Sequence, residues 1–390
     1  MSPSSVFLDE GVLDLNFVPL RLLHRDKEMR FLSSLFRFIV DTPYEMSQRA
    51  VIVGGIGTGK TVLAQRFGMN LEEEARRRRI KARYIHVNCR ESRGSLFMVL
   101  SRAVRDLRPN FPDRGYSANE LLDTLMRILD EDEQQLLLCL DEVDALIEKE
   151  GSDALYYLTR VQEERMEGPR RLSLICISKD SEAFKALDRS TLSTLQRNVV
   201  RMSDYTQPQL ADILTSRAEQ AFRTGAISEE IVMFISELAE SEGGDARYAI
   251  DILWGAGKRA DTVYSQEVLP EHVRKAAASL FPTLRTEEIE RLSRHEQLAL
   301  LGIARHFVHS KEPHATTGEV ELAYKVACEE HGEEPRGHTQ FWKYLNNLSG
   351  LAMVSTRLHA SEKGRTQLVS LSKVPAEELD KAVTRILDEA

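Results

Sequence analysis

Short runs rich in apolar residues alternate with amphipathic stretches through the first half of the chain. The runs are four to seven residues long and cover 50–53, 82–88, 136–140 and 172–178. Between them, apolar residues recur every three or four positions, which is typical of one face of a helix. Strands that are apolar along their length are buried on both faces. The order therefore predicts an α/β fold, a parallel sheet with helices on both sides.

The pattern changes near Tyr205, after which amphipathic helical stretches continue to Leu280 without a strand-like run. The segment 281–283, Phe-Pro-Thr, predicts a domain boundary. Beyond it the pattern predicts three helices, then a pair of strands and a last helix, with the helices at 287–306, 317–330 and 337–350 and the strands within 352–371. We therefore expect three domains, over residues 1–203, 204–284 and 285–390.

A glycine-rich octapeptide follows the first predicted strand. Residues 54–61 read Gly-Gly-Ile-Gly-Thr-Gly-Lys-Thr, and helical spacing begins at Val62. A strand, then G-x-x-x-x-G-K-T, then a helix is the context of a phosphate-binding loop. Its backbone N–H groups surround an anion, and the helix N-terminus adds a partial positive charge. We therefore predict binding of ATP or ADP by the loop residues Gly55, Gly57, Thr58, Gly59, Lys60, Thr61 and Val62.

Two side chains of this loop have specific predicted roles. Lys60 is expected to reach the β- and γ-phosphates, and the Thr61 hydroxyl to coordinate Mg²⁺. A third apolar strand ends in Asp141 and Glu142. A carboxylate at the carboxyl end of a neighbouring strand can hold Mg²⁺ opposite Thr61, so Asp141 is the second predicted metal ligand. Glu142 is placed to polarise a water molecule for attack on the γ-phosphate.

Composition changes this picture little. Of the 390 residues, 42% are hydrophobic and 29% charged, and no window approaches a membrane-spanning run. The four cysteines show no C-x-x-C spacing, which disfavours a zinc site or a disulfide framework and indicates a reducing cytoplasm. The net charge of −9 argues against a general nucleic-acid coat, although a local basic face remains compatible with it.

Several motifs together resemble one family, the AAA+ ATPases that act as archaeal replication initiators and are related to the origin-recognition complex and its cell-division-control cofactor. Besides the two NTPase motifs, the resemblance is carried by Val18-Pro19, 24–28, 87–90, 140–144, 177–180 and the Gly-Asp-Ala-Arg string within 244–251. It covers nearly the whole chain from Phe17. It implies a P-loop NTPase core of the AAA+ type, a helical lid and a C-terminal winged-helix domain.

The resemblance also implies roles for single residues. Arg247 matches the lid arginine that senses the γ-phosphate, and Arg189 matches the arginine finger presented to a neighbouring subunit. Val18 and Pro19 match the segment that lies against adenine, and Tyr205 is assigned to the nucleotide site with them.

One position departs from the family pattern. Lys179 stands where the family has an asparagine that orients the attacking water. A lysine donates hydrogen bonds but accepts none, so it cannot replace both functions of an amide. We therefore predict slow hydrolysis, with ATP and ADP acting mainly as a conformational switch.

The C-terminal pattern of helix, turn and helix followed by a two-stranded wing is a DNA-binding layout. Residues 336–373 contain six basic residues and one acidic residue, an asymmetry that favours phosphate contacts. Contacts with protein are the alternative use of such a domain. The predicted DNA-binding residues are His338, Thr339, Gln340 and Lys343 on the second helix, and Arg357, Lys363 and Arg365 on the wing.

A turn-rich insert at 108–116 adds one more candidate. The resemblance implies an extra DNA-contacting element there, with Arg114 as the contact, and a plain surface loop is the alternative.

Together these features predict an ATP-dependent replication initiator. It is expected to bind double-stranded origin DNA through both the wing domain and the ATPase domain, and to recruit or load the replicative helicase. Other initiator subunits are expected to meet it through Arg189. A cytoplasmic, nucleoid-associated protein without membrane contact is expected. The alternatives are a STAND-type ATP-gated regulator, disfavoured because no sensor repeat precedes Ala390, and a clamp-loader subunit, disfavoured by the basic wing.

Overall fold

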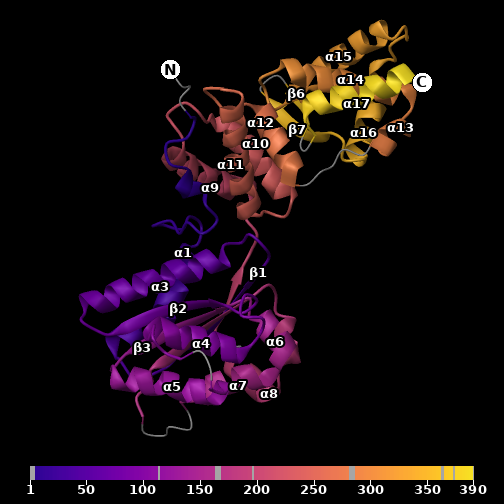
Figure 1. Cartoon of the computed structure of the whole chain (residues 1–390). Helices are drawn as coiled ribbons and strands as arrows, with labels where there is room; N and C mark the ends of the chain where they lie inside the picture. Colours follow the sequence, from indigo (N-terminus) through magenta and orange to yellow (C-terminus); the bar gives the residue numbers. More distant parts are fainter. Residues whose placement is uncertain are drawn as a thin grey trace. The chain divides into compact units, whose positions relative to one another are not determined.

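The computed structural model describes residues 5–112, 115–162, 168–195, 197–280, 286–361, 364–371 and 374–389. Contacts divide the chain into two compact units (Figure 1), and the first is Asn16–Tyr205. The second unit combines Met1–Leu15 with Thr206–Ala390. Among the described helices, none has the length and apolar character needed to cross a bilayer.

The first unit is built on a five-stranded sheet in the order β2-β3-β4-β1-β5, in which every pair of neighbours is parallel. Its strands are β1 (Arg49–Gly54), β2 (Ala82–Asn88), β3 (Gln135–Asp141), β4 (Leu172–Ser178) and β5 (Val199–Met202). Strands β3 and β4 are buried along their whole length. The α/β prediction is therefore confirmed. The short edge strand β5 has no apolar run long enough to reveal it in the sequence.

Side chains of successive strand residues enter two separate cores, one on each face of the sheet. Val51 and Val53 pack with α4 (Leu96–Leu107), α5 (Ala118–Glu131), α6 (Asp144–Glu150) and α7 (Ser152–Arg160). Ala50 and Ile52 pack with α1 (Asp26–Phe36), α2 (Phe38–Asp41) and α3 (Lys60–Arg77). The short helices η2 (Ala183–Ala186) and α8 (Arg189–Leu195) precede β5. Because α3 follows β1 directly, the loop between them lies at the carboxyl end of β1 and at the N-terminus of α3.

The second unit begins with four helices, α9 (Gln207–Ala221), α10 (Glu229–Ser241), α11 (Ala246–Thr262) and α12 (Pro270–Leu280). Residues before the first unit pack here too, through the short helix η1 (Glu10–Leu13). The Phe7 ring lies 4.7 Å from the Phe222 ring, and Gly257 of α11 leaves space for it, since a Cβ there would lie 2.3 Å from Phe7 Cζ. Residues 5–15 thus pack with these helices, whereas the boundaries taken from the sequence place them with the sheet.

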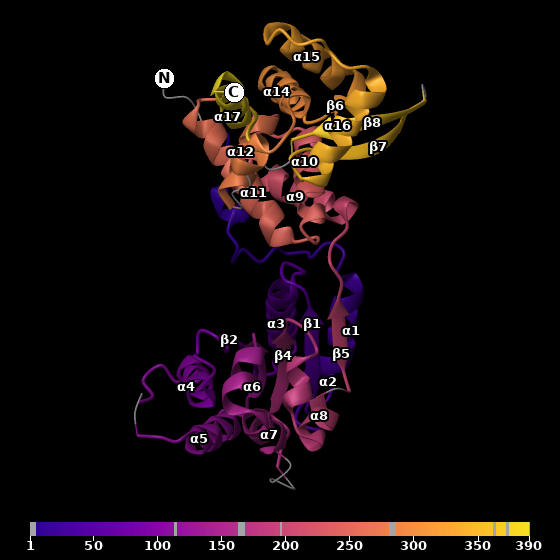
Figure 2. The ribbon, with the colours of Figure 1, turned by 90° about the vertical axis from the view of Figure 1, so that its right-hand side faces the viewer.

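The rest of this unit has the expected winged layout. Its elements are α13 (Thr286–Glu290), α14 (Arg294–His309), β6 (Ala315–Thr316), α15 (Thr317–Glu330), α16 (His338–Gly350), β7 (Ser355–Ser361), β8 (Gly364–Ser370) and α17 (Ala376–Glu389). Strands β6, β8 and β7 form an antiparallel sheet, and β7 and β8 make a hairpin beside α16 (Figure 2). The single helix predicted over 287–306 is wrong. A capping box between Ser293 and Glu296 starts a new helix there.

Arg274 joins the four-helix segment to the winged domain within this unit. Its side chain is fully buried, and its Nε donates to the carbonyl of Leu371 at 3.0 Å. The guanidinium carbon lies 4.6 Å from the centre of the Phe307 ring, and an ion pair with Glu271 spans 3.5 Å. Burial lowers the pKa of Arg274 to about 10, still well above neutrality, so the buried group carries its charge. A buried, charged and hydrogen-bonded side chain therefore links the four-helix segment to the winged domain.

We predict that Arg274→Met destabilises the second unit by about 3 kcal/mol, because a carbonyl and a carboxylate lose their buried partner. The control is Lys275→Met, which removes a partly exposed ion pair with Glu377 and should cost about 1 kcal/mol or less. Urea denaturation of the full chain measures both values. Equal losses for the two variants would contradict this role for Arg274.

Candidate nucleotide-binding site and nucleic-acid interface

The loop between β1 and α3 is folded as a phosphate-binding loop. Gly57 and Gly59 have φ angles of 72° and 86°, in the left-handed region that glycine adopts without steric cost. Lys60 Nζ donates to the carbonyls of Gly54 at 2.8 Å and Gly55 at 2.6 Å, so its ammonium lies inside the curve of the loop. The Thr58 hydroxyl also donates to the Gly55 carbonyl, at 3.0 Å. The predicted loop residues are thus brought together at the N-terminus of α3.

Arg25 supports this loop; it lies in the stretch 24–28 that carries the family resemblance, but no individual role was predicted for it. It is only 4% exposed, and its Nη2 donates to the carbonyls of Thr58 and Ser203, both at 2.8 Å. Its Nε donates to Tyr205 Oη at 2.9 Å, and the guanidinium stacks 4.0 Å from the centre of that ring. Arg25 therefore links the phosphate loop to the segment that follows β5, where Tyr205 was predicted to meet the nucleotide.

The segment predicted to lie against adenine is tied to the same helix. Arg66 of α3 donates from Nε to the carbonyl of Pro19 at 2.8 Å and from Nη2 to that of Val18 at 3.2 Å. Both segment residues are partly buried. Arg66 was also missed, since an arginine in an amphipathic helix usually faces solvent. Through it, Val18 and Pro19 are attached to the helix that begins at the loop.

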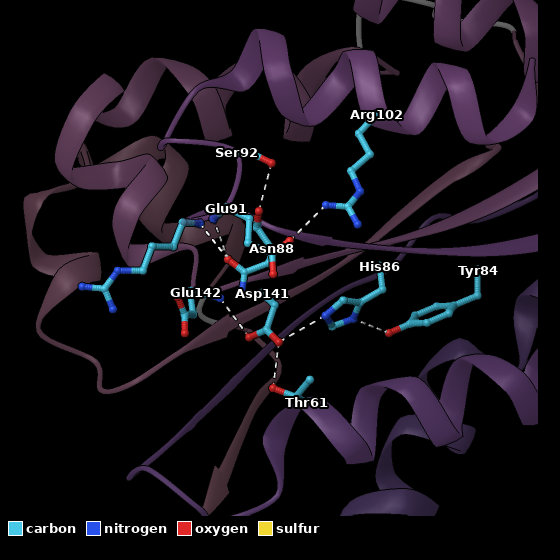
Figure 3. A network of polar contacts seen from close by, with 10 residues as sticks. Thr61, Tyr84, His86, Asn88, Glu91, Ser92, Arg102, Asp141 and Glu142 are labelled. Carbon is cyan, nitrogen blue, oxygen red and sulfur yellow. Dashed lines mark hydrogen bonds and ion pairs between the residues drawn. The ribbon is translucent and has the colours of Figure 1, made fainter. Parts of the chain in front are cut away.

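Asp141 lies at the carboxyl end of the inner strand β3 and receives hydrogen bonds from several sides (Figure 3). Thr61 Oγ1 donates to its Oδ2 at 2.7 Å, and His86 Nε2 lies 3.2 Å from the same oxygen. The backbone N–H of Glu142 donates to Oδ1 at 2.9 Å. Burial acts to raise the pKa of Asp141, but the hydrogen bonds from His86 and Thr61 outweigh it and leave the pKa below its ordinary value. The carboxylate is therefore ionised at neutral pH.

The two predicted Mg²⁺ ligands, Thr61 and Asp141, are thus adjacent and offer hard oxygen atoms. Mg²⁺ in phosphate-binding sites uses one or two protein oxygens and completes its octahedron with phosphate and water. This donor set fits that mode. A cage made of protein side chains alone is not offered, since no cluster of three or more His, Cys, Asp or Glu occurs in the described part of the chain.

Two further predicted residues flank this carboxylate at the same edge of the sheet. Glu142 has a φ of 50°, uncommon for a residue with a side chain, and its carboxyl group is exposed. Lys179 follows β4, is exposed, and donates its backbone N–H to Asp144 Oδ2 at 3.3 Å. The buried Ser178 hydroxyl donates to the other oxygen of Asp144. The roles predicted for Glu142 and Lys179 stay predictions.

Both predicted arginine sensors are exposed. Arg189 begins α8 in the first unit. Arg247 lies in the first turn of α11 in the second unit, where the Asp245 side chain caps the helix by accepting from the backbone N–H groups of Arg247 and Tyr248. Their guanidinium groups are thus accessible to a partner, and their roles stay predictions as well.

The predicted recognition helix α16 has one buried and one exposed face. Phe341, Leu345 and Leu348 are fully buried, and Tyr344 is partly buried. The opposite face presents the four predicted contacts, His338, Thr339, Gln340 and Lys343, all exposed. His338 also contacts the Glu321 carboxylate through Nδ1, which lowers the pKa of that carboxyl group. Sequence reasoning missed Trp342, which is 48% exposed and donates from Nε1 to Gln367 Oε1 of β8 at 3.2 Å.

The wing contacts are described only in part. Arg357 of β7 pairs with Glu237 of α10, a carboxylate that also contacts His314 Nε2 at 2.8 Å. Its guanidinium is therefore engaged within the protein and is half exposed, with 45% of the side chain accessible. Lys363 and Arg114 lie outside the described residues, as does the side chain of Arg365.

Fold and site together define a P-loop nucleotide-binding protein with a winged-helix domain. Comparison with protein families agrees: residues 47–187 match the AAA domain, 211–278 the Cdc6 AAA+ ATPase-type lid domain, and 287–382 the CDC6 C-terminal winged helix domain. The chain is 34% identical to ORC1-type DNA replication protein 2 of Sulfurisphaera tokodaii, over 97% of this chain and 93% of that protein.

Comparison with solved structures supports the same relationship to Cdc6 and ORC1 proteins. Cdc6p from Pyrobaculum aerophilum matches with a TM-score of 0.86 at 31% identity and 99% coverage of both chains. Aeropyrum pernix ORC1, solved in complex with DNA, matches with a TM-score of 0.65 at 30% identity, over 99% of this chain and 97% of that one. Aeropyrum pernix ORC2, solved with ADPNP and ADP, matches with a TM-score of 0.66 at 26% identity, over 98% and 99%. The chain belongs to the archaeal ORC1/Cdc6 family of replication initiators.

We predict that Arg25→Met weakens ADP binding about tenfold, or ~1.4 kcal/mol. The reason is that the carbonyl of Thr58 loses its buried donor and the loop loses its support. Titration with a fluorescent ADP analogue measures the change. The exposed Arg21, changed to Met, is the matched control and should bind as the parent does. Unchanged affinity in a folded Arg25→Met protein would contradict this support.

Proposed function

We propose that this protein binds double-stranded origin DNA in an ATP-dependent way and helps recruit or load the replicative helicase. The observation that carries the DNA-binding part is the exposed polar face of α16 beside the β7–β8 hairpin. A recognition helix with exposed polar side chains at its N-terminal end, next to a wing, suits a DNA groove. The DNA complex of Aeropyrum pernix ORC1, a relative of similar length, supports the same use here.

In this proposal, the nucleotide site acts as a conformational switch. ATP or ADP is held by the loop around Lys60, and Mg²⁺ by Thr61 and Asp141, where it would draw charge from the phosphates. Glu142 polarises the attacking water, while Lys179 orients it poorly because an ammonium group accepts no hydrogen bond. Nucleotide therefore stays bound long enough to set a conformation.

Two exposed arginines report the nucleotide state in this scheme. Arg247 on α11 senses the γ-phosphate from the lid, where a guanidinium fork suits phosphate oxygens better than an ammonium does. Arg189 on α8 contacts the nucleotide of a neighbouring initiator subunit. The three-domain division at residues 203 and 284 separates core, lid and winged helix. The protein works in the cytoplasm, on the nucleoid.

We predict that Lys343→Ala weakens binding to double-stranded DNA about tenfold, ~1.4 kcal/mol. The plot of log affinity against log salt should become less steep by about one unit, because one phosphate contact is lost. Lys381, exposed on α17, is the control: its change to Ala should leave both quantities as in the parent. Fluorescence anisotropy at several salt concentrations gives both values. If the two variants behaved alike, the assignment of α16 as the DNA-reading helix would fail.

We predict multiple-turnover ATP hydrolysis slower than about 1 s⁻¹, the low end of typical enzyme rates. Lys179→Asn should raise the rate, because an amide can both donate to and accept from water. Phosphate release under saturating ATP measures both proteins, with Lys185→Asn on η2, an exposed lysine, as the control. A parent rate above that limit would contradict the slow switch.

A further inference from the structure

His86, for which no role was predicted, is in direct contact with Asp141, the predicted metal ligand. It belongs to β2, which pairs with β3 in parallel, with Asn88 opposite Asp141. Its Nε2 lies 3.2 Å from Asp141 Oδ2, the oxygen that also accepts from Thr61. The imidazole is 19% exposed and the carboxylate 5%, so water competes little for this contact. One buried oxygen thus meets donors from two different elements.

A tyrosine completes the contacts of the imidazole ring (Figure 3). Tyr84 Oη lies 3.0 Å from His86 Nδ1. An ionised carboxylate only accepts hydrogen bonds, so His86 must carry its proton on Nε2. Burial raises the pKa of Tyr84 well above its ordinary value, so the hydroxyl keeps its proton. Both ring nitrogens of His86 thus have a hydrogen-bonding partner, which fixes the orientation of the imidazole ring.

The tyrosine is in turn fixed to the helix that carries Thr61. Gly68 of α3 leaves the space for its ring, since a Cβ at that position would lie 2.2 Å from Tyr84 Cγ. The backbone N–H of Tyr84 donates to Glu72 Oε1, also on α3, at 2.8 Å. Tyr84, His86, Asp141 and Thr61 thus form a series of contacts. Helix α3 contacts its first member, Tyr84, and carries its last member, Thr61.

We propose that His86 is a positioning residue for Asp141. It donates a hydrogen bond to Oδ2 and so keeps the carboxylate turned toward Thr61, in the orientation in which both bind the Mg²⁺ of the nucleotide. Tyr84 holds the imidazole ring in this orientation through its contact with Nδ1. Partners of this kind, one step removed from the metal, typically change metal affinity 10- to 100-fold. The inference rests on the proposed Mg²⁺–nucleotide site and adds the residue that orients it.

The test measures the Mg²⁺ concentration that gives half of the Mg²⁺-dependent gain in ADP affinity, with binding in EDTA as the second readout. His86→Leu and His86→Asn should raise this concentration about tenfold, since neither places a donor at the Nε2 position, and should leave binding in EDTA unchanged. His86→Gln should restore it, because its amide nitrogen reaches that position. Tyr84→Phe should raise it by a smaller factor.

Two outcomes would overturn the proposal. Unchanged Mg²⁺ dependence in His86→Leu would mean that the ring only fills space. A His86→Gln protein as poor as His86→Leu would mean that the imidazole acts in another way than by donating to Asp141. Lys60→Ala separates this inference from the proposed function, because it should abolish ADP binding in EDTA and in Mg²⁺ alike. If Lys60→Ala still bound ADP, the nucleotide site itself would be misplaced.

Discussion

The buried carboxylate of Asp141 is the constraint on which the nucleotide site depends. An ionised group at 5% exposure is costly unless it is paired and hydrogen-bonded. Three parts of the fold supply these hydrogen bonds: Thr61 at the start of α3, His86 on β2 and the backbone after β3. The same contacts bring the end of the phosphate loop to the edge of the sheet. The polar ends of parallel strands and the N-terminus of a helix thus meet at one edge of the sheet, an arrangement that suits the phosphates of a nucleotide.

Most of the fold could be predicted from the sequence because its signals are local. Buried strands, the glycine loop and the winged layout are each contained in a short stretch of chain. The capping box at Ser293 and Glu296 is equally local, and overlooking it produced the wrong helix over 287–306. By contrast, Arg25 acts on Thr58 and Tyr205, 33 and 180 positions away. Arg25 lies in a stretch that carries the family resemblance, but the residues beside it do not reveal its distant partners, and the same holds for Arg66 and His86.

The second unit contains both the predicted nucleotide sensor, Arg247, and the predicted DNA-reading helix, α16. Arg247 lies on α11, and the recognition helix α16 belongs to the winged domain that Arg274 joins to α12. The ion pair between Arg357 and Glu237 is a second contact of this kind, between the wing and α10. In the proposed mechanism, a change that nucleotide imposes on the lid is therefore passed to the DNA-binding surface through charged contacts. The side chain of Arg357 is 45% exposed, so the guanidinium can also face a phosphate while it is paired with Glu237.

In the proposed mechanism, a nucleotide-holding initiator of the ORC1/Cdc6 family binds origin DNA. Nuclease footprinting of the purified protein on chromosomal DNA, with and without ATP, tests it most directly. We expect protected sites at a replication origin, with a pattern that changes when ATP is present. Absence of a protected site at any origin under both conditions would contradict it.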